Sequence, residues 1–204
     1  RAKSLCKVNP IKYGSIAIDN GFLILNEDEK IDLIKREPLS EKYIFTYGGG
    51  AEFIKNIKRY CLWLKDLNPN ELKLMPIVKE KIDSVRDFRF SSDREATKKL
   101  AEYPTLFGED RQPKNNYILI PKVSSETRQY IPLGFLNKSH IANGSSMIVE
   151  NATLFEFGIL TSIMHMAWIK YTCGRMKSDY QYSNTIVYNN YPFPKNVSEK
   201  QKKA

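Results

Sequence analysis

The stretch from residue 68 to residue 103 constrains the fold most, because its pattern is helical while both flanks have the pattern of strands. Pro69 stands at the first position of a helix that Asn68 opens. From Pro76 to about Arg89, apolar residues recur at helical spacing between lysines and acids. These residues are Ile77, Ile82, Val85 and Phe88. We expect a charged, solvated helical section that supports or separates two lobes.

Two further helices are marked by their ends. Asn26 and the acids after it predict a helix that runs to about Glu37, where a proline stops it. Ser91 to Asp93 predict the cap of a helix from Arg94 to about Tyr103, and a proline again follows.

Apolar and aromatic runs predict strands on the N-terminal side of this section. They are "FLIL" at 22–25, "KYIFTYGGG" at 42–50 and "RYCLWL" at 59–64. The triple glycine has neither the G-x-G-x-x-G spacing nor the Lys-Ser/Thr of a phosphate-binding loop. We therefore expect no nucleotide or cofactor site there.

The C-terminal side has its own strand patterns. The runs "YILIPKV" and "QYIPLGFL" each contain one proline, which suits edge strands and strand ends. Asn143 and Gly144 predict a turn, followed by a strand around Met147 to Val149. Residues 150–173 predict one long buried helix that Gly174 ends.

Together these patterns predict a mixed α/β (α+β) domain over residues 1–194. Its approximate lobes are 1–110 and 111–194. Residues 195–204 form a lysine-rich tail or the start of a following region.

Several protein classes are disfavoured. Ala152–Ile169 has roughly the minimum length of a membrane span, about 17 residues, but Glu156 and His165 interrupt it, so we expect a core helix and no membrane partner. The three scattered cysteines form no C-x-x-C pair, which favours reduced thiols in an intracellular protein without a zinc site. The two histidines have no metal-ligand spacing, and His165 is expected to be a satisfied core histidine. The chain alone should catalyse nothing.

The net charge of +9 is unevenly distributed. Residues 1–12 contribute +4 and residues 195–204 contribute +3. Residues 13–110 carry 16 basic and 18 acidic groups, or −2, whereas residues 111–194 carry 8 basic and 4 acidic groups, or +4. The second half is therefore the better candidate for contact with nucleic-acid phosphates.

The segment "CGRMKSDYQYSN" carries the most specific candidate site. In an extended chain, Lys177, Asp179 and Gln181 share one face. Lysine can donate to guanine O6 and N7, aspartate can accept from the cytosine amine, and glutamine can pair with adenine. The alternative is a local ion pair on an exposed strand.

Contacts with the DNA backbone are expected from other polar groups of the basic half. Their charge and hydroxyl chemistry suit phosphate oxygens. These residues are Arg111, Ser124, Ser125, Arg128, Arg175, Tyr180 and Tyr182.

Long motifs in this order resemble the target-recognition domain of MmeI-like (type IIL/IIG) restriction–modification enzymes and related adenine-specific DNA methyltransferases. The motifs are "RYCLWL", "FGEDRQP", "IPKVSSETRQYIPLGFL", "FGILTSIMHMAW" and "CGRMKSDYQYSNTIVYNNYPFP". The resemblance spans about Asn9 to Pro194.

This resemblance implies a larger parent enzyme in the cytoplasm of a bacterium or archaeon. A methyltransferase domain with its own N-P-P-Y loop would precede this domain, bind S-adenosylmethionine and be its partner within the same chain. This domain would then bind double-stranded DNA and hold no cofactor. A nuclease region, where present, would lie further upstream.

The resemblance also implies which positions contact bases. Lys177, Asp179 and Gln181 match reading positions, and a Lys/Asp combination implies guanine beside the methylated adenine. Gln181 departs from the arginine common among relatives. Asn143 and Gly144 fall in a turn that supplies a second reading position.

Two alternatives stay open. One is a protein-interaction or domain-docking module without base reading. The other is a complete small methyltransferase with Asn190–Phe193 ("NYPF") as its catalytic loop, which would need a glycine-rich cofactor loop after a strand. Tyr191 stands where such a loop has its first proline, so we expect Asn190, Tyr191 and Phe193 to pack against the preceding lobe instead.

Overall fold

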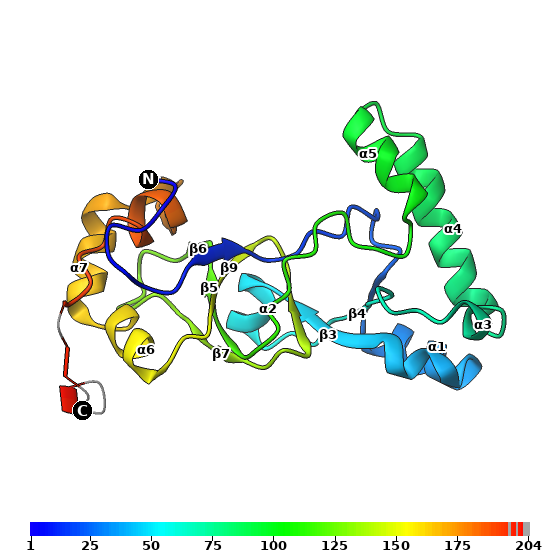
Figure 1. The fold of residues 1–204 in the computed structure, drawn as a ribbon, viewed down its shortest axis with the longest axis horizontal. Coiled ribbons are helices and arrows are strands. Elements are labelled where there is room, and N and C mark those ends of the chain that lie inside the picture. Colours follow the sequence, from blue (N-terminus) through cyan, green and yellow to red (C-terminus); the bar gives the residue numbers. More distant parts are fainter. Residues whose placement is uncertain (196, 199, 202–204) are drawn as a thin grey trace.

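The computed structural model describes residues 1–195, 197–198 and 200–201, so the predicted tail at 195–204 lies partly outside the described residues. The body is elongated, with helices at both ends and strands between them (Figure 1). It contains three sheets and several helices, which confirms the predicted mixed α+β fold.

The N-terminal lobe is built on a four-stranded sheet of order β2-β4-β3-β8. The strands are β2 (Ile24–Leu25), β4 (Tyr60–Leu62), β3 (Ile44–Gly48) and β8 (His140–Ala142). Only the β3–β8 pair is parallel. The helices of this lobe are α1 (Glu27–Arg36), α2 (Gly50–Lys55), α3 (Pro69–Leu72), α4 (Pro76–Phe90) and α5 (Glu95–Lys99), with 3-10 helices at Pro38–Tyr43 and Leu100–Glu102.

Local capping explains where α1 begins. The Asn26 side chain accepts a hydrogen bond from the Glu29 N–H at 2.9 Å, and the Glu29 carboxylate accepts one from the Asn26 N–H at 2.8 Å. The α4 helix instead uses a distant cap, because the buried Glu37 carboxylate accepts hydrogen bonds from the N–H groups of Ile77 and Val78. This contact fixes the end of α1 against the start of α4.

Arg89 anchors the other end of α4. Its side chain is fully buried, and its guanidinium donates five hydrogen bonds of 2.7–3.0 Å to main-chain carbonyls. The acceptors belong to Ala17, Ile18, Leu100, Tyr103 and Leu106. The predicted solvated section therefore holds an internal cation that ties three segments together.

The C-terminal lobe contains an antiparallel sheet of order β1-β9-β5-β7. The strands are β1 (Ile11–Tyr13), β9 (Ser146–Glu150), β5 (Tyr117–Pro121) and β7 (Gly134–Leu136). Helices α6 (Leu154–Leu160) and α7 (Ile163–Thr172) and a π-helical turn at Asn184–Tyr188 close its core. Tyr191 and Phe193 are buried in that core, as predicted.

The predicted single helix over 150–173 is wrong. The chain forms α6 and α7 with a break between them, because the Ser162 hydroxyl accepts a hydrogen bond from the His165 N–H and starts a new helix. The outer face of α7 is also not buried, since Ile163 is 72% exposed and Tyr171 is 92% exposed. No helix within the described ranges is long and apolar enough to cross a membrane.

The sequence suggested two lobes that divide at residue 110, but the strand pairing shows a different arrangement. Strand β1 pairs with β9 in the C-terminal lobe, while β8 pairs with β3 in the N-terminal lobe. A small cluster at the junction of the lobes contains Tyr117, Leu119 and Ile148. The chain thus crosses between lobes several times, which ties them into one body.

Candidate nucleic-acid interface

A β-hairpin carries the central candidate residues. Strands β10 (Gly174–Met176) and β11 (Asp179–Gln181) pair antiparallel with Met176 opposite Asp179, so the turn contains two residues. Lys177 occupies this turn with a φ of 56°, a left-handed conformation that favours glycine. Lys177 therefore lies at the hairpin tip, not on the extended face that the alternation predicted.

The alternation holds along β11 and the residue that follows it. Tyr180 and Tyr182 are 4% and 2% exposed, whereas Asp179 and Gln181 are half-buried on the other side of the strand. The Tyr182 hydroxyl lies 3.0 Å from Nε2 of His165, inside the core. The predicted phosphate contact of Tyr182 is therefore wrong, since its hydroxyl is enclosed and engaged.

His165 is a core residue, as predicted, but only half satisfied. Among the described residues its Nδ1 has no hydrogen-bond partner, and burial lowers the pKa of the imidazole to about 4. The buried, neutral His165 therefore contacts the end of β11 through the Tyr182 hydroxyl.

The polar groups of the outward-facing hairpin residues are free. Lys177 and Asp179 form no ion pair with each other or with any other residue that the structure describes. Their side chains and that of Gln181 also have no hydrogen-bond partner within the described part of the chain. The simple local ion pair is thus not formed, and these groups remain available to a ligand.

Arg175 is held on the same hairpin by two contacts. Its guanidinium lies 4.0 Å from the centre of the Tyr180 ring, and Nη1 donates to the Ser178 carbonyl at 3.0 Å. The ring of Tyr180 is buried and packs against Arg175. Arg175 is therefore better placed than Tyr180 for the predicted contact with the DNA backbone.

Strand β6 (Val123–Ser124) pairs with β11 and completes a three-stranded sheet of order β10-β11-β6, and it leads into an exposed loop. Ser124 is 3% exposed and its Oγ is enclosed, so the predicted phosphate contact of Ser124 is wrong. Ser125 shares a 3.0 Å hydrogen bond with Thr127. Arg128 is exposed, and its guanidinium has no partner among the described residues. The loop therefore offers Arg128 as a free cation.

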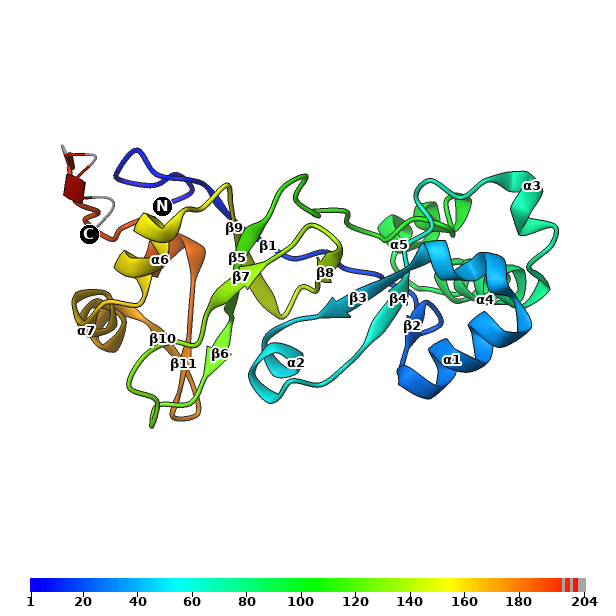
Figure 2. The ribbon, with the colours of Figure 1, turned by 90° about the horizontal axis from the view of Figure 1, so that it is seen from below.

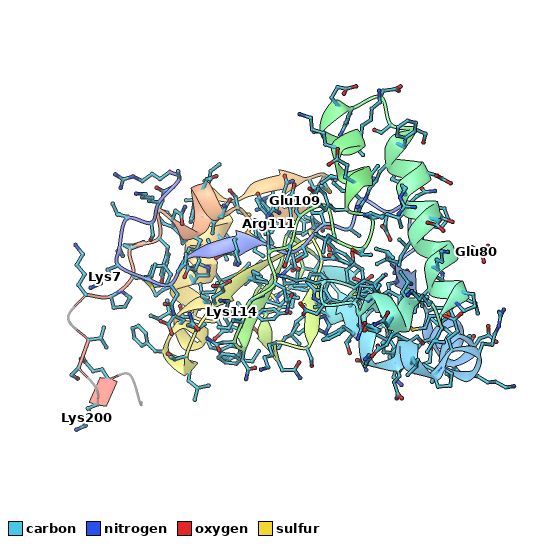
Figure 3. The ribbon with its side chains drawn as sticks, turned by 45° about the vertical axis from the view of Figure 1, so that its right-hand side comes forward. Lys7, Glu80, Glu109, Arg111, Lys114 and Lys200 are labelled. Atoms are coloured by element: carbon cyan, nitrogen blue, oxygen red, sulfur yellow. The ribbon has the colours of Figure 1, made fainter. Side chains whose placement is uncertain are left out.

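Arg111 is engaged within the protein. It forms an ion pair with Glu109, and its guanidinium donates to the Gly14 carbonyl at 3.3 Å. Figure 3 labels Arg111 and Glu109, which lie together in the middle of the molecule. Arg111 thus holds the segments of Gly14 and Glu109 together. Because its guanidinium is engaged within the protein, its position does not support the predicted phosphate contact.

The turn containing Asn143 and Gly144 forms between β8 and β9, as predicted. The backbone of Lys122 joins this turn to β11, because its N–H donates to the Ser145 carbonyl at 3.1 Å and its carbonyl accepts from the Tyr182 N–H at 2.7 Å. Figure 2 shows the hairpin, the loop after β6 and helix α2 projecting from the same side of the body.

Comparison with known proteins adds to this geometry. A family model described as the target recognition domain of MmeI matches residues 1–195. The chain belongs to this family. It is 34% identical over 194 residues to DNA methyltransferase A of Bacillus subtilis (strain 168), which covers 95% of this chain and 22% of that protein.

A solved structure of the type IIL restriction–modification enzyme MmeI in complex with DNA also matches this target-recognition domain. The TM-score is 0.95 at 38% identity, over 100% of this chain and 27% of that chain. The chain thus spans about a quarter of the length of these two relatives.

Sequence reasoning missed two positions in this target-recognition domain. Lys122 joins the turn to the hairpin through its backbone, which no side-chain pattern reveals. Gly49 lies against the turn, and its signal in the sequence is the triple glycine, whose close packing a comparison with nucleotide-binding loops does not reveal. Within the described ranges there is no group of three metal-binding side chains, and Cys6, Cys61 and Cys173 form no disulfide.

Proposed function

We propose that this chain recognises a specific double-stranded DNA sequence for a longer, S-adenosylmethionine-dependent enzyme of the restriction–modification type. That enzyme methylates the exocyclic amine of adenine, and this domain selects the site. Membership of the MmeI target recognition domain family supports the proposal, together with the +4 balance of residues 111–194. A nuclease region would add cleavage where the enzyme contains one.

The observation that carries the proposal is the strained placement of Lys177. A lysine in a left-handed turn costs on the order of 1 kcal/mol or more relative to glycine. The ammonium group makes no ion pair among the described residues, so no salt bridge within them offsets this cost. A lysine held there at the tip of an exposed hairpin is suited to an external acceptor.

Asp179 and Gln181 extend the same surface. The Lys177 ammonium can donate to guanine O6 and N7, while the Asp179 carboxylate can accept from the amine of the paired cytosine. One lysine and one aspartate can therefore distinguish a G·C pair from the other pairs. We propose guanine beside the methylated adenine, and an acceptor–donor contact from Gln181 to a neighbouring base.

The cofactor would be bound by another part of the longer protein. The triple glycine at 48–50 cannot cradle a phosphate here, because the space beside Gly49 is filled by Asn143 and Ser145. S-adenosylmethionine would supply the methyl group, and this chain would supply the choice of DNA site.

The test exchanges Lys177 and Asp179 in the complete polypeptide, as the double variant K177D/D179K. The methylated sequence is then mapped in the DNA of cells that express the enzyme. We expect methylation to move to sites with a different base pair at one position. Retention of the original sequence at lower total activity would contradict base reading by this pair.

One observation favours a second function, a domain-docking module without base reading. Helix α7 exposes Ile163 and Met164, which are 72% and 70% exposed, and Tyr171 of the same helix is exposed as well. Under this alternative, the exchange at 177 and 179 changes only total activity, and I163S/M164S separates this domain from its partner.

A further inference from the structure

The triple glycine at the end of β3 packs against the turn that contains Asn143. The Asn143 N–H donates to the Gly48 carbonyl at 2.9 Å, and the Gly50 N–H donates to the Ser145 hydroxyl at 3.3 Å. The Gly49 N–H donates a hydrogen bond to the Glu52 carboxylate at 2.9 Å. The turn is therefore bonded to Gly48 and Gly50, while the Gly49 N–H is bonded within the β3–α2 junction.

Gly49 has no room for a side chain. A Cβ at this position would lie 2.0 Å from Oδ1 of Asn143 and 2.2 Å from Oγ of Ser145. Gly14 encloses the turn from its main-chain side, since a Cβ there would lie 2.2 Å from the Asn143 carbonyl oxygen. The turn is thus held between two glycines, and Gly49 lies directly against the Asn143 side chain.

The hydrogen bonds of Asn143 fix which end of its amide is free. Oδ1 accepts from the Ser145 N–H at 2.9 Å and from the Ser145 hydroxyl at 2.6 Å. A main-chain N–H can only donate, so the atom facing it must be the oxygen. Nδ2 has no hydrogen-bond partner among the described residues, and it is not enclosed by the protein, so it can reach an external acceptor.

We infer that Gly49 positions Asn143 so that the turn presents the Nδ2 amine, a group that can only donate hydrogen bonds, to the DNA. This inference rests on the proposed function and deepens it. Asparagine usually recognises adenine with both amide atoms, but here both lone pairs of Oδ1 are used inside the turn. The base edge opposite Asn143 therefore presents an acceptor, such as purine N7, guanine O6 or thymine O4.

Asn143→Asp provides a sharp test, because the replacement keeps one oxygen for the two Ser145 donors. Only the outward group changes, from a donor to an acceptor. The complete polypeptide is used to select duplexes from a pool with randomised base pairs. We expect N143D to shift the preference at one base pair toward an edge with a donor, the amine of cytosine or adenine, by about tenfold.

Gly49→Ala tests the positioning role. We expect it to weaken the preference at the same base pair about tenfold, while leaving the preference set by Lys177 and Asp179 unchanged. In the double variant G49A/N143A the preference should match that of N143A alone, because Gly49 acts through Asn143. Gly158→Ala is the control, since a Cβ there meets no atom within 4 Å.

The outcomes separate this inference from the proposed function. If the unaltered polypeptide selects no sequence, the proposed function fails. If it selects one, and N143D leaves every base preference unchanged, the donor role of Asn143 is overturned. If G49A is folded by thermal melting and keeps the preference at the Asn143 base pair, the positioning role is overturned. If G49A does not fold, N143D and N143A still decide whether Asn143 presents the donor.

Discussion

The Nε2 atom of His165 lies 3.0 Å from the hydroxyl oxygen of Tyr182, and both side chains are enclosed in the core of the C-terminal lobe. Nδ1 of the same ring has no hydrogen-bond partner in the part of the chain that the structure describes, and burial lowers the pKa of His165 from 6.5 to about 4. Because Tyr182 directly follows Gln181, this contact links α7 to the end of the hairpin. Protonation would place a charged imidazolium in this enclosed site, with a buried Nδ1–H that has no acceptor among the described residues, so the folded chain favours the neutral ring.

The stability of the chain should therefore depend on His165 between pH 6.5 and 4. In this window the unfolded chain binds a proton at His165 that the folded chain does not, so the free energy of unfolding falls as the pH falls. The contribution is complete above pH 6.5, is lost by about pH 4, and amounts to about 3 kcal/mol. We expect His165→Gln to reduce the slope of this free energy against pH, measured by urea denaturation at pH 7, 6, 5 and 4.

Tyr182→Phe is the matched comparison. It removes the hydrogen bond but keeps the imidazole buried, so we expect a loss of about 1–3 kcal/mol at every pH with the slope preserved. Equal slopes for the original chain and H165Q would contradict the assignment to His165.

Arg89 should be the most sensitive basic residue of the N-terminal lobe. Lysine has three donors on a single nitrogen and cannot reach the five carbonyls that the guanidinium contacts. We expect Arg89→Lys to lower the free energy of unfolding by about 3 kcal/mol or more. Arg86→Lys, at an exposed arginine paired with Asp83, should change it by less than about 0.5 kcal/mol. Similar losses in urea denaturation would contradict this role of Arg89.

Arg89 and Glu37 also show why part of the fold could not be predicted. The start of α1 is encoded locally, by Asn26 and Glu29 three residues apart, and α4 is encoded by its apolar period. The cap of α4 comes instead from Glu37, 40 residues before Ile77 in the chain. Such contacts exist only after distant segments meet, and so does the parallel pairing of β3 with β8.

The candidate site shows the same division. Alternation placed Asp179 and Gln181 on one side of the strand and Tyr180 and Tyr182 on the other, but it could not show that the tyrosines face the core. Charge alone could not distinguish Arg128, which is free, from Arg111, which Glu109 engages. The break before α7 did have a local signal, a serine able to cap a helix, which the apolar character around it obscured.

Lys177 separates the shape of the hairpin from its chemistry. Glycine relieves the left-handed strain but makes the unfolded chain more flexible, so we expect Lys177→Gly to change the free energy of unfolding by less than about 0.5 kcal/mol. Lys177→Val places a β-branched residue at a φ of 56° and should cost about 1 kcal/mol or more. Both should lose the same base preference in selection from a randomised duplex pool. If K177G keeps this preference, the ammonium group does not read a base.

Arg128 and Arg111 make a matched pair for the phosphate contacts. Arg128 is exposed and has no partner among the described residues. If it neutralises one phosphate, Arg128→Gln should weaken binding to all duplexes and reduce the slope of log K against log salt by about one. Arg111→Gln should leave that slope unchanged, because its charge is already compensated by Glu109. The measurement is a salt titration of duplex binding with the specific and an unrelated sequence. A loss with R128Q confined to the specific sequence would instead place Arg128 at a base edge, since phosphate contacts carry no sequence information directly.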